Sequence, residues 1–198
     1  MPGTLSRERI VDVALQLAER EGPEALSMRR IAAELGTGAM SLYNHVPDKA
    51  ALLAAVAERV LAEVELPDDA SWRETTRVWA TSLRAALLAH RAVVMIVISA
   101  GEARPLMATS RALVLRLRKI GIDDDWSVRI MGTVGRFVAG SVFLDAALIR
   151  RGTRSPEDVA ARFADGLADL LDGMALRVPE ARPADGPHAD GSSPDPDR

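Results

Sequence analysis

The chain has 198 residues, with 25 Lys and Arg against 28 Asp and Glu, which gives a formal charge of −3. This balance argues against a histone-like or ribosomal protein that coats nucleic acid through bulk positive charge. The absence of cysteine excludes disulfide frameworks, thiolate metal sites and cysteine nucleophiles. The three histidines are scattered and lack metal-ligand spacing, so we expect neither a metal site nor a cofactor.

The sequence gives no sign of a membrane-spanning or exported protein. No uncharged apolar run approaches the roughly 20 residues that a membrane span needs. The N-terminus meets Arg7, Glu8 and Arg9 within a few residues and lacks the apolar core of a signal peptide. We therefore expect a cytoplasmic protein without a membrane partner.

The net negative charge of the chain comes from its C-terminal residues. Residues 178–198 hold five acids, two arginines and five of the eleven prolines, and no large apolar residue follows Val178. Such a segment buries too little surface to offset the entropy of ordering it, so we predict a disordered acidic tail. Without the tail, 23 positive and 23 negative charges remain, and the body of the chain is neutral.

The first part of the chain reads as a series of short helices. Ser6 is placed to cap a helix that ends at Gly22 and Pro23. Ser27 is placed to cap a short helix that ends at Gly36, and a further short helix is predicted over residues 37–46. Pro47 breaks this helix, and Asp48 begins a longer one.

Further helices are predicted up to the tail, so the fold class is all-α. Ser71 is placed to begin a helix with Trp72, Thr76, Trp79, Leu83 and Leu87 along one stripe. Residues 93–98 are apolar and mostly β-branched, which favours a strand by propensity, but no partner strand is evident and we predict a short buried helix. Longer helices are predicted over residues 105–120 and 125–150, and the last one begins at Ser155 and Pro156.

Residues 27–49 are the part of the sequence that indicates a function. Two short helices joined by a tight turn at Gly36, Thr37 and Gly38 form the arrangement of a helix-turn-helix, whose second helix enters the DNA major groove. Leu42 and Val46 are spaced to face inward, and the remaining surface of the second helix carries no negative charge. An Arg30–Glu34 pair, four residues apart, is interpreted as a solvated helix pair rather than a base contact.

These residues resemble a known family. The runs LSMRRIAAELG and SLYNHVPDKAALL, preceded by LSRERIVDVALQLAEREG, look like the DNA-binding domain of the TetR (tetracycline repressor) family of bacterial transcription regulators. The run SWRETTRVWATSLRAALLAHR, residues 71–91, is similar to the fifth helix of the tetracycline repressor itself. The resemblance implies a helix-turn-helix domain over 1–47, a connecting helix over 48–64 and a ligand-binding and dimerisation domain over 65–177, before the tail at 178–198.

The resemblance and the side-chain chemistry together give the expected contacts with a double-stranded DNA operator. Hydroxyl and lysine donors suit phosphates, whereas arginine, asparagine and small apolar side chains suit base edges. The candidate DNA-binding residues are Ser27, Met28, Arg29, Thr37, Gly38, Ala39, Met40, Ser41, Tyr43, Asn44, His45 and Lys49. Several of them differ from the tetracycline repressor's own reading residues, so we expect a different operator sequence.

The C-terminal helices imply a homodimer and an effector pocket. The resemblance implies that the two last helices of each subunit form a four-helix bundle with the partner subunit. The candidate ligand-binding residues are Trp79, Leu83, His90, Val97, Met107, Met131 and Phe137, each of which is equally consistent with ordinary core. Trp79 and Val97 fall where the tetracycline repressor holds its drug and magnesium with polar groups, so we expect a larger, apolar or aromatic effector instead.

Taken together, the sequence predicts a ligand-responsive repressor that binds a palindromic operator as a dimer and is released by its effector. Two other classes are weighed beside it. One is a helical small-molecule-binding protein or enzyme without sequence-specific DNA binding, although no catalytic constellation is visible and we expect no enzyme activity. The other is a structural helical adaptor.

Overall fold

The computed structural model describes residues 5–68, 70–91 and 104–178. These residues form helices and no strand, which confirms the all-α fold class. The helices are α1 (Arg7–Glu21), η1 (Pro23–Ala25), α2 (Met28–Glu34), α3 (Ala39–Tyr43), α4 (Lys49–Leu61), α5 (Trp72–Ala89), α7 (Arg104–Lys119), α8 (Asp124–Arg150) and α9 (Pro156–Ala175). The helix predicted over residues 93–98 and the tail beyond residue 178 lie outside the described residues.

Local capping sets where most of these helices begin. A side-chain oxygen of the capping residue accepts a hydrogen bond from the backbone N–H three residues further on, which satisfies one of the unpaired donors of the first turn. This bond is made by Ser6, Ser27, Asp48, Ser71, Asp123 and Ser155. The predicted helix starts at Ser6, Ser27, Asp48, Ser71 and Ser155 are therefore confirmed.

Helix α3 is shorter than the helix predicted over residues 37–46. At its start, Gly38 has an extended backbone and offers no side chain as a cap. At its end, the N–H groups of His45 and Val46 both donate to the carbonyl of Leu42, so the chain closes into a turn there.

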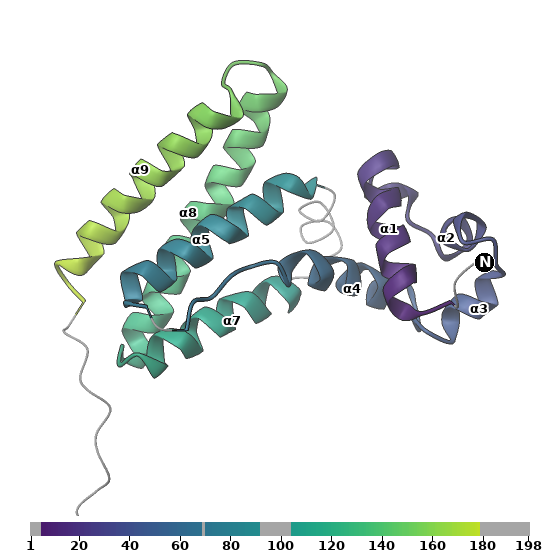
Figure 1. The fold of residues 1–198 in the computed structure, drawn as a ribbon, viewed down its shortest axis with the longest axis horizontal. Coiled ribbons are helices and arrows are strands. Elements are labelled where there is room, and N and C mark those ends of the chain that lie inside the picture. Colours follow the sequence, from purple (N-terminus) through teal and green to yellow (C-terminus); the bar gives the residue numbers. More distant parts are fainter. Residues whose placement is uncertain (1–4, 69, 92–103, 179–198) are drawn as a thin grey trace, which may run out of the picture.

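The N-terminal helices form a head with its own core. Figure 1 shows α1, α2 and α3 gathered at one end of the molecule, with α4 leading from them toward the remaining helices. The buried side chains of this head core include Ile10, Leu17, Leu26, Ile31, Leu42, Leu52 and Val56. Ala86 of α5 packs into the same cluster and therefore joins the head to the rest of the protein.

The C-terminal helices surround a second core. Helix α8 packs against α5 and α7, and α9 packs along α8 as its neighbour (Figure 1). The cluster is built around Trp79, Leu83, Leu113, Leu117, Ile130, Val134 and Leu167. Leu61, the last residue of α4, belongs to this second core, whereas the earlier residues of α4 belong to the head core. Helix α4 is thus shared by both units.

Among the described helices, α8 is long and apolar enough to cross a bilayer by length and composition alone. Its most apolar 18-residue window has a mean hydropathy of 1.4, and only 22% of that window is buried. The exposed side chains of Phe143 and Leu144 account for part of this apolar surface. In a single subunit, α8 therefore presents apolar side chains that nothing in the described residues covers.

Candidate DNA-binding surface and effector cavity

The turn between α2 and α3 has a geometry that requires glycine. Gly36 has a φ of 66°, in the left-handed region that other residues rarely adopt. The N–H of Thr37 donates to the carbonyl of Ala32 at 2.9 Å, and the N–H of Gly36 donates to Ala33 at 3.2 Å, which together satisfy the last carbonyls of α2. This turn lets α3 begin three residues after Gly36 and cross close to α2.

One side of helix α3 packs into the head core, and the other side is exposed to solvent. Leu42 is fully buried, whereas the side chains of Met40 and Tyr43 are 78% and 45% exposed. The exposed residues among the sequence-predicted set are Ser27, Arg29, Gly38, Met40, Tyr43, Asn44, His45 and Lys49, and the half-buried ones are Thr37, Ala39 and Ser41. Hydroxyl, amide, imidazole, ammonium and guanidinium donors therefore gather around α3 without a carboxylate on α3 itself.

Met28 is the exception in this set. Its side chain is buried in the head core, because the first turn of α2 packs onto the neighbouring helices of the head. The structure therefore corrects the prediction for Met28, whose side chain cannot reach DNA in this arrangement.

An exposed network of ion pairs braces α2 against the end of α1. Arg30 contacts Glu34 at 2.9 Å, which confirms the predicted helix pair, and it also contacts Glu21 at 2.8 Å. Arg20 contacts the same two carboxylates, with Glu34 at 2.9 Å and Glu21 at 3.1 Å. Hydrogen bonds from Arg20 and Arg30 hold the pKa of Glu34 below its usual range, and those from Arg30 and Arg20 do the same for the pKa of Glu21.

A cavity of about 260 Å³ lies in the C-terminal core between α5, α7 and α8. Its lining is mostly apolar, with Ser110 and Arg136 as the polar members. The lining residues are Trp79, Leu83, Leu87, Leu106, Ser110, Met131, Gly132, Gly135, Arg136, Val138 and Ala139. This is the kind of apolar lining with few polar groups that small-molecule sites use.

The structure brings three of the sequence-predicted ligand residues, Trp79, Leu83 and Met131, to this cavity. The ring of Phe137 instead stacks on Phe163 of α9, with centroids 5.3 Å apart, so it belongs to helix packing. Met107 is 67% exposed and does not line the cavity. Val97 lies outside the described residues.

His90 also lies away from the cavity, between the head and the core. Its Nδ1 is 2.9 Å from Glu19 of α1, and its Nε2 is 3.9 Å from Glu63, just beyond α4. Because His90 ends α5, this cluster ties the end of a core helix to the first helix of the head. His90 thus does not join the residues that line the core cavity, and it lies beside two carboxylates at the boundary of the two units.

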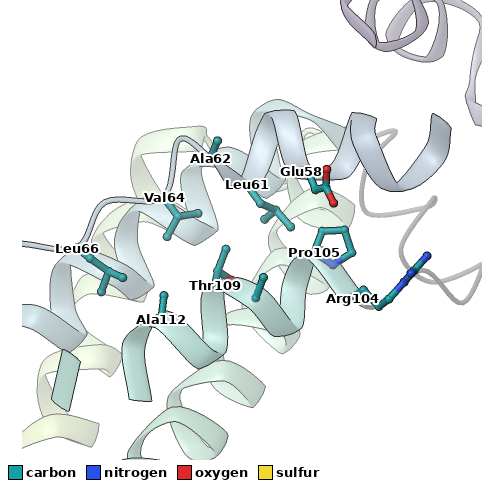
Figure 2. Close-up of a pocket in the computed structure, with 10 residues that line it drawn as sticks. Glu58, Leu61, Ala62, Val64, Leu66, Arg104, Pro105, Thr109 and Ala112 are labelled. Carbon is teal, nitrogen blue, oxygen red and sulfur yellow. The ribbon is translucent and has the colours of Figure 1, made fainter. Parts of the chain in front are cut away.

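A second cavity of about 360 Å³ opens at the seam between α4 and α7. Figure 2 shows Leu61, Val64 and Leu66 on one side of it, facing Pro105, Thr109 and Ala112 on the other. The two cavities lie against different faces of α7, since Leu106 and Ser110 line the core cavity, whereas Pro105, Thr109 and Ala112 line the one beside α4. Helix α7 thus has open volume along two of its faces.

Several site residues were not predicted from the sequence. Arg136, Ser110 and the glycines at 132 and 135 line the core cavity, but in the sequence they fit an ordinary amphipathic helix. The signal was partly present, because Gly132 and Gly135 lie one turn apart and indicate a small-residue surface on α8. Among the described residues, no cluster of His, Cys, Asp or Glu suited to a metal ion occurs.

Comparisons with known proteins match both units of the chain. The family described as bacterial regulatory proteins, tetR family, matches residues 10–56, and a tetracyclin repressor-like C-terminal domain matches residues 66–159. The chain is 30% identical to the tetracycline repressor protein class A from transposon 1721 of Escherichia coli, over 92% of this chain and 96% of that relative.

Two proteins of Streptomyces add to this likeness. The chain is 34% identical to the HTH-type transcriptional repressor DrrR1 of Streptomyces coeruleorubidus over 70% of its own length, and this match spans about half of DrrR1 (53%). The crystal structure of the TetR family protein ActR of Streptomyces coelicolor in complex with actinorhodin superposes with a TM-score of 0.73 at 29% identity, covering 91% of this chain and 100% of ActR.

Proposed function

Because the chain belongs to the TetR family of bacterial regulatory proteins, we propose that it is a transcriptional repressor that binds a palindromic operator as a homodimer and is released by a small, largely apolar or aromatic effector. The observation that carries this proposal is the outward face of α3. It combines exposed Tyr43 and Asn44 with Arg29 and Lys49 nearby, on a helix fixed to the head core by Leu42. The arrangement suits insertion of a short helix into the major groove.

Each exposed side chain of the head has a role in this proposal. The Tyr43 hydroxyl, the Lys49 ammonium and the Ser27 hydroxyl suit phosphate oxygens, which fix the position of the head on the duplex. Asn44 is suited to the edge of an adenine, and Met40 is suited to the methyl group of a thymine. Arg29 is suited to a guanine edge or a phosphate.

The dimer of this proposal uses α8 and α9. The exposed apolar side chains on α8, Phe143 at 78% and Leu144 at 56%, are costly in water, and a second copy of the same face would cover them. One α3 helix contacts only a few base pairs, whereas two that are about 34–36 Å apart read two half-sites one helical turn apart. Dimerisation therefore supplies both the cover for α8 and the second reading head.

Effector release follows from the way the two units are joined. An effector in the core cavity contacts α5, α7 and α8, and the seam cavity between α7 and α4 leaves room for these two helices to shift. Because α4 is shared by both cores, such a shift changes the position of the head. An effector that favours a head spacing unsuited to the operator lowers the affinity for DNA.

The protein acts in the bacterial cytoplasm in this proposal and catalyses no reaction. Its relatives are regulators and repressors by name, and the core cavity pairs its apolar lining with one serine and one arginine rather than a nucleophile and a base. The alternative, a small-molecule-binding protein or enzyme without sequence-specific DNA binding, predicts turnover or ligand binding with only non-specific affinity for DNA.

The two lysines of the chain provide a matched test by gel retardation, with the intergenic DNA beside the gene as the probe. Lys49 lies beside α3, whereas Lys119 lies at the end of α7. Lys49→Ala is expected to weaken binding to all duplexes and to reduce the salt-dependence slope by about 1, because one phosphate contact is lost. Tyr43→Ala is expected to weaken binding as well, and Lys119→Ala to leave it unchanged. Equal affinities for Lys49→Ala, Lys119→Ala and the wild type would contradict the proposed contact surface.

A further inference from the structure

We propose that protonation of His90 fastens the head to the C-terminal helices, so that the affinity of the protein for its operator rises as the pH falls through the range in which an imidazole gains its proton. His90 is in this proposal a positioning residue that touches neither the DNA nor the effector. The effect on operator binding rests on the proposed function, whereas the tie between the head and α5 is independent of it.

His90 lies at the junction of the two units. It is the C-terminal capping residue of α5, and its backbone N–H donates to the carbonyl of Ala86 at 3.0 Å. Ala86 packs into the head core. Figure 1 shows this end of α5 directed toward α1, and the side chain of His90 reaches Glu19 of α1 and Glu63 just beyond α4. A change in these contacts therefore acts directly on the connection between the head and α5.

Each ring nitrogen of His90 faces a carboxylate oxygen. Nδ1 lies 2.9 Å from Oε1 of Glu19, which is a hydrogen-bond distance, and Nε2 lies 3.9 Å from Oε2 of Glu63. An ionised carboxylate only accepts hydrogen bonds, whereas a neutral imidazole has one N–H donor and one acceptor nitrogen. In either neutral tautomer, one nitrogen lone pair therefore faces a carboxylate. The imidazolium carries a donor on both nitrogens and is the form that attracts both carboxylates.

Two arginines are also close to this contact. Arg59 lies 3.6 Å from Glu63 and 3.4 Å from Asp12 of α1, so it is shared between two carboxylates. Arg91 directly follows His90 in the chain and is exposed to solvent. Because Arg59 neutralises part of the charge of Glu63, Glu19 supplies the stronger attraction for the protonated ring. Carboxylate oxygens thus remain next to both ring nitrogens.

The sign of the pH effect follows from these contacts. An imidazole changes its charge between about pH 5 and pH 8, and glutamates are ordinarily ionised in this range. Both attractions are therefore present at the acidic end of the range and are lost at its alkaline end. A head that is restrained relative to α5 loses less conformational freedom when it binds its half-site. The protonated protein thus has the higher operator affinity.

The first test measures the tie within one chain. Because the chain has no cysteine, spin labels at Ala33→Cys on α2 and Thr81→Cys on α5, both exposed, report the distance between the head and α5. An excess of unlabelled protein confines the measurement to single chains. The distance distribution is expected to be narrower at about pH 5.5 than at about pH 8 in the wild type, and broad at both in His90→Gln, which stays neutral. Equal widths at both pH values in the wild type would overturn the proposal.

Two matched controls assign the pH dependence to this contact. His45→Gln removes the other histidine among the described residues and is expected to keep the pH-dependent width. Glu63→Gln is expected to reduce the pH dependence, because it removes the negative charge beside Nε2, whereas Glu65→Gln, two residues further on, is expected to keep it. A pH dependence that is lost in His45→Gln, or reduced equally in Glu63→Gln and Glu65→Gln, would contradict the role of His90.

The second test extends the effect to operator binding. Affinity for the intergenic DNA beside the gene is measured by fluorescence anisotropy at about pH 5.5 and about pH 8. Between these values, the wild type is expected to lose about threefold to fivefold more affinity than His90→Gln, the contribution of a partly exposed ion pair. Comparing the two proteins cancels the titration of His45, which both retain.

The outcomes separate this inference from the proposed function. Equal losses of affinity in the wild type and His90→Gln would overturn the coupling of His90 to operator binding and would leave the protein as a repressor. If neither protein binds this DNA specifically at either pH, the proposed function is contradicted, and the spin-label distances still decide whether protonation of His90 fastens the head.

Discussion

A single ion pair links three helices of the C-terminal core. Nη2 of Arg84 on α5 lies 2.6 Å from Oδ2 of Asp145 on α8, and both side chains are about nine-tenths buried. The guanidinium also lies over the ring of Phe163 on α9, 4.7 Å from its centroid. Removing one partner of a buried pair leaves an uncompensated charge, which costs far more than the intact pair contributes.

Asp145→Ala is therefore expected to lower the free energy of unfolding by about 3 kcal/mol, because it leaves Arg84 buried without its carboxylate. Chemical denaturation monitored by circular dichroism measures this change. Asp165→Ala on the exposed face of α9 is the control and is expected to stay within about 0.5 kcal/mol of the wild type. Equal stabilities of the two variants would show that the pair does not hold the core together.

The surroundings of several single residues could not be predicted from the sequence. The burial of Met28 and the position of His90 depend on neighbours that come from other helices, and the Arg84–Asp145 pair spans 61 residues of chain. Periodicity identifies which side of a helix is apolar, but it does not identify the partner of a polar side chain on another helix. The local features, such as the caps and the glycine turn at Gly36, were predictable because they depend on residues a few positions apart.

Ion pairs among Arg20, Glu21, Arg30 and Glu34 help to hold helix α2 in position against α1. The pKa values of Glu21 and Glu34 are lowered in the folded protein, so the folded state favours their charged forms. The stability that these pairs contribute is fully present above the ordinary glutamate pKa, 4.5, and is lost as the pH falls through the lowered values. The contribution is modest, because the side chains are exposed and screened by solvent.

A pH series of thermal unfolding tests this network. Glu34→Gln is expected to have a slightly lower unfolding midpoint than the wild type at pH 7, because it loses its attraction to Arg20 and Arg30. The difference is expected to begin to shrink as the pH falls below about 4.5 and to approach zero once the pH is below the lowered pKa of Glu34, where the wild-type carboxylate is protonated too. A difference that stays constant from pH 7 to pH 3 would mean that the charge of Glu34 contributes nothing.

The end of α5 is joined to the head by His90. We expect His90→Ala to change the stability by no more than about 1 kcal/mol, because such partly exposed pairs contribute little. Loss of the contact with Glu19 is expected instead to broaden the distribution of distances between the two heads of the dimer. Because the chain has no cysteine, one spin label at Ala33→Cys, on the exposed side of α2, reports this distance directly. Thr81→Ala is the control and is expected to leave the distance distribution unchanged. If His90→Ala leaves it unchanged as well, the contact of His90 with Glu19 does not couple the core to the head.

At the level of the whole molecule, two hydrophobic cores share one helix, and the larger unit leaves an apolar face open. The helix-turn-helix and the order of the helices were predictable from the sequence, because they follow from spacing, caps and turn residues. The cavities were not, because they arise where α4, α5, α7 and α8 meet, and each contributes only a few side chains.

The exposed face of α8 gives a prediction for the assembly. Phe143→Glu is expected to reduce the mass measured by analytical ultracentrifugation from about twice 21.3 kDa to the single-chain value, because the charge opposes burial of this face. The control is Leu115→Glu on α7, where the native leucine is 50% exposed, and it is expected to remain dimeric. A dimeric Phe143→Glu would place the subunit interface on another surface.

The most direct test of the account is selection of bound duplexes from a fully randomised DNA library by the full-length protein. The account predicts enrichment of one inverted repeat, with half-site centres about one helical turn apart, because two copies of α3 read the two halves. The same selection with Phe143→Glu is expected to recover no such repeat. If the wild type enriches no sequence, or enriches a single unrepeated site, the account of a dimeric operator-reading repressor is contradicted.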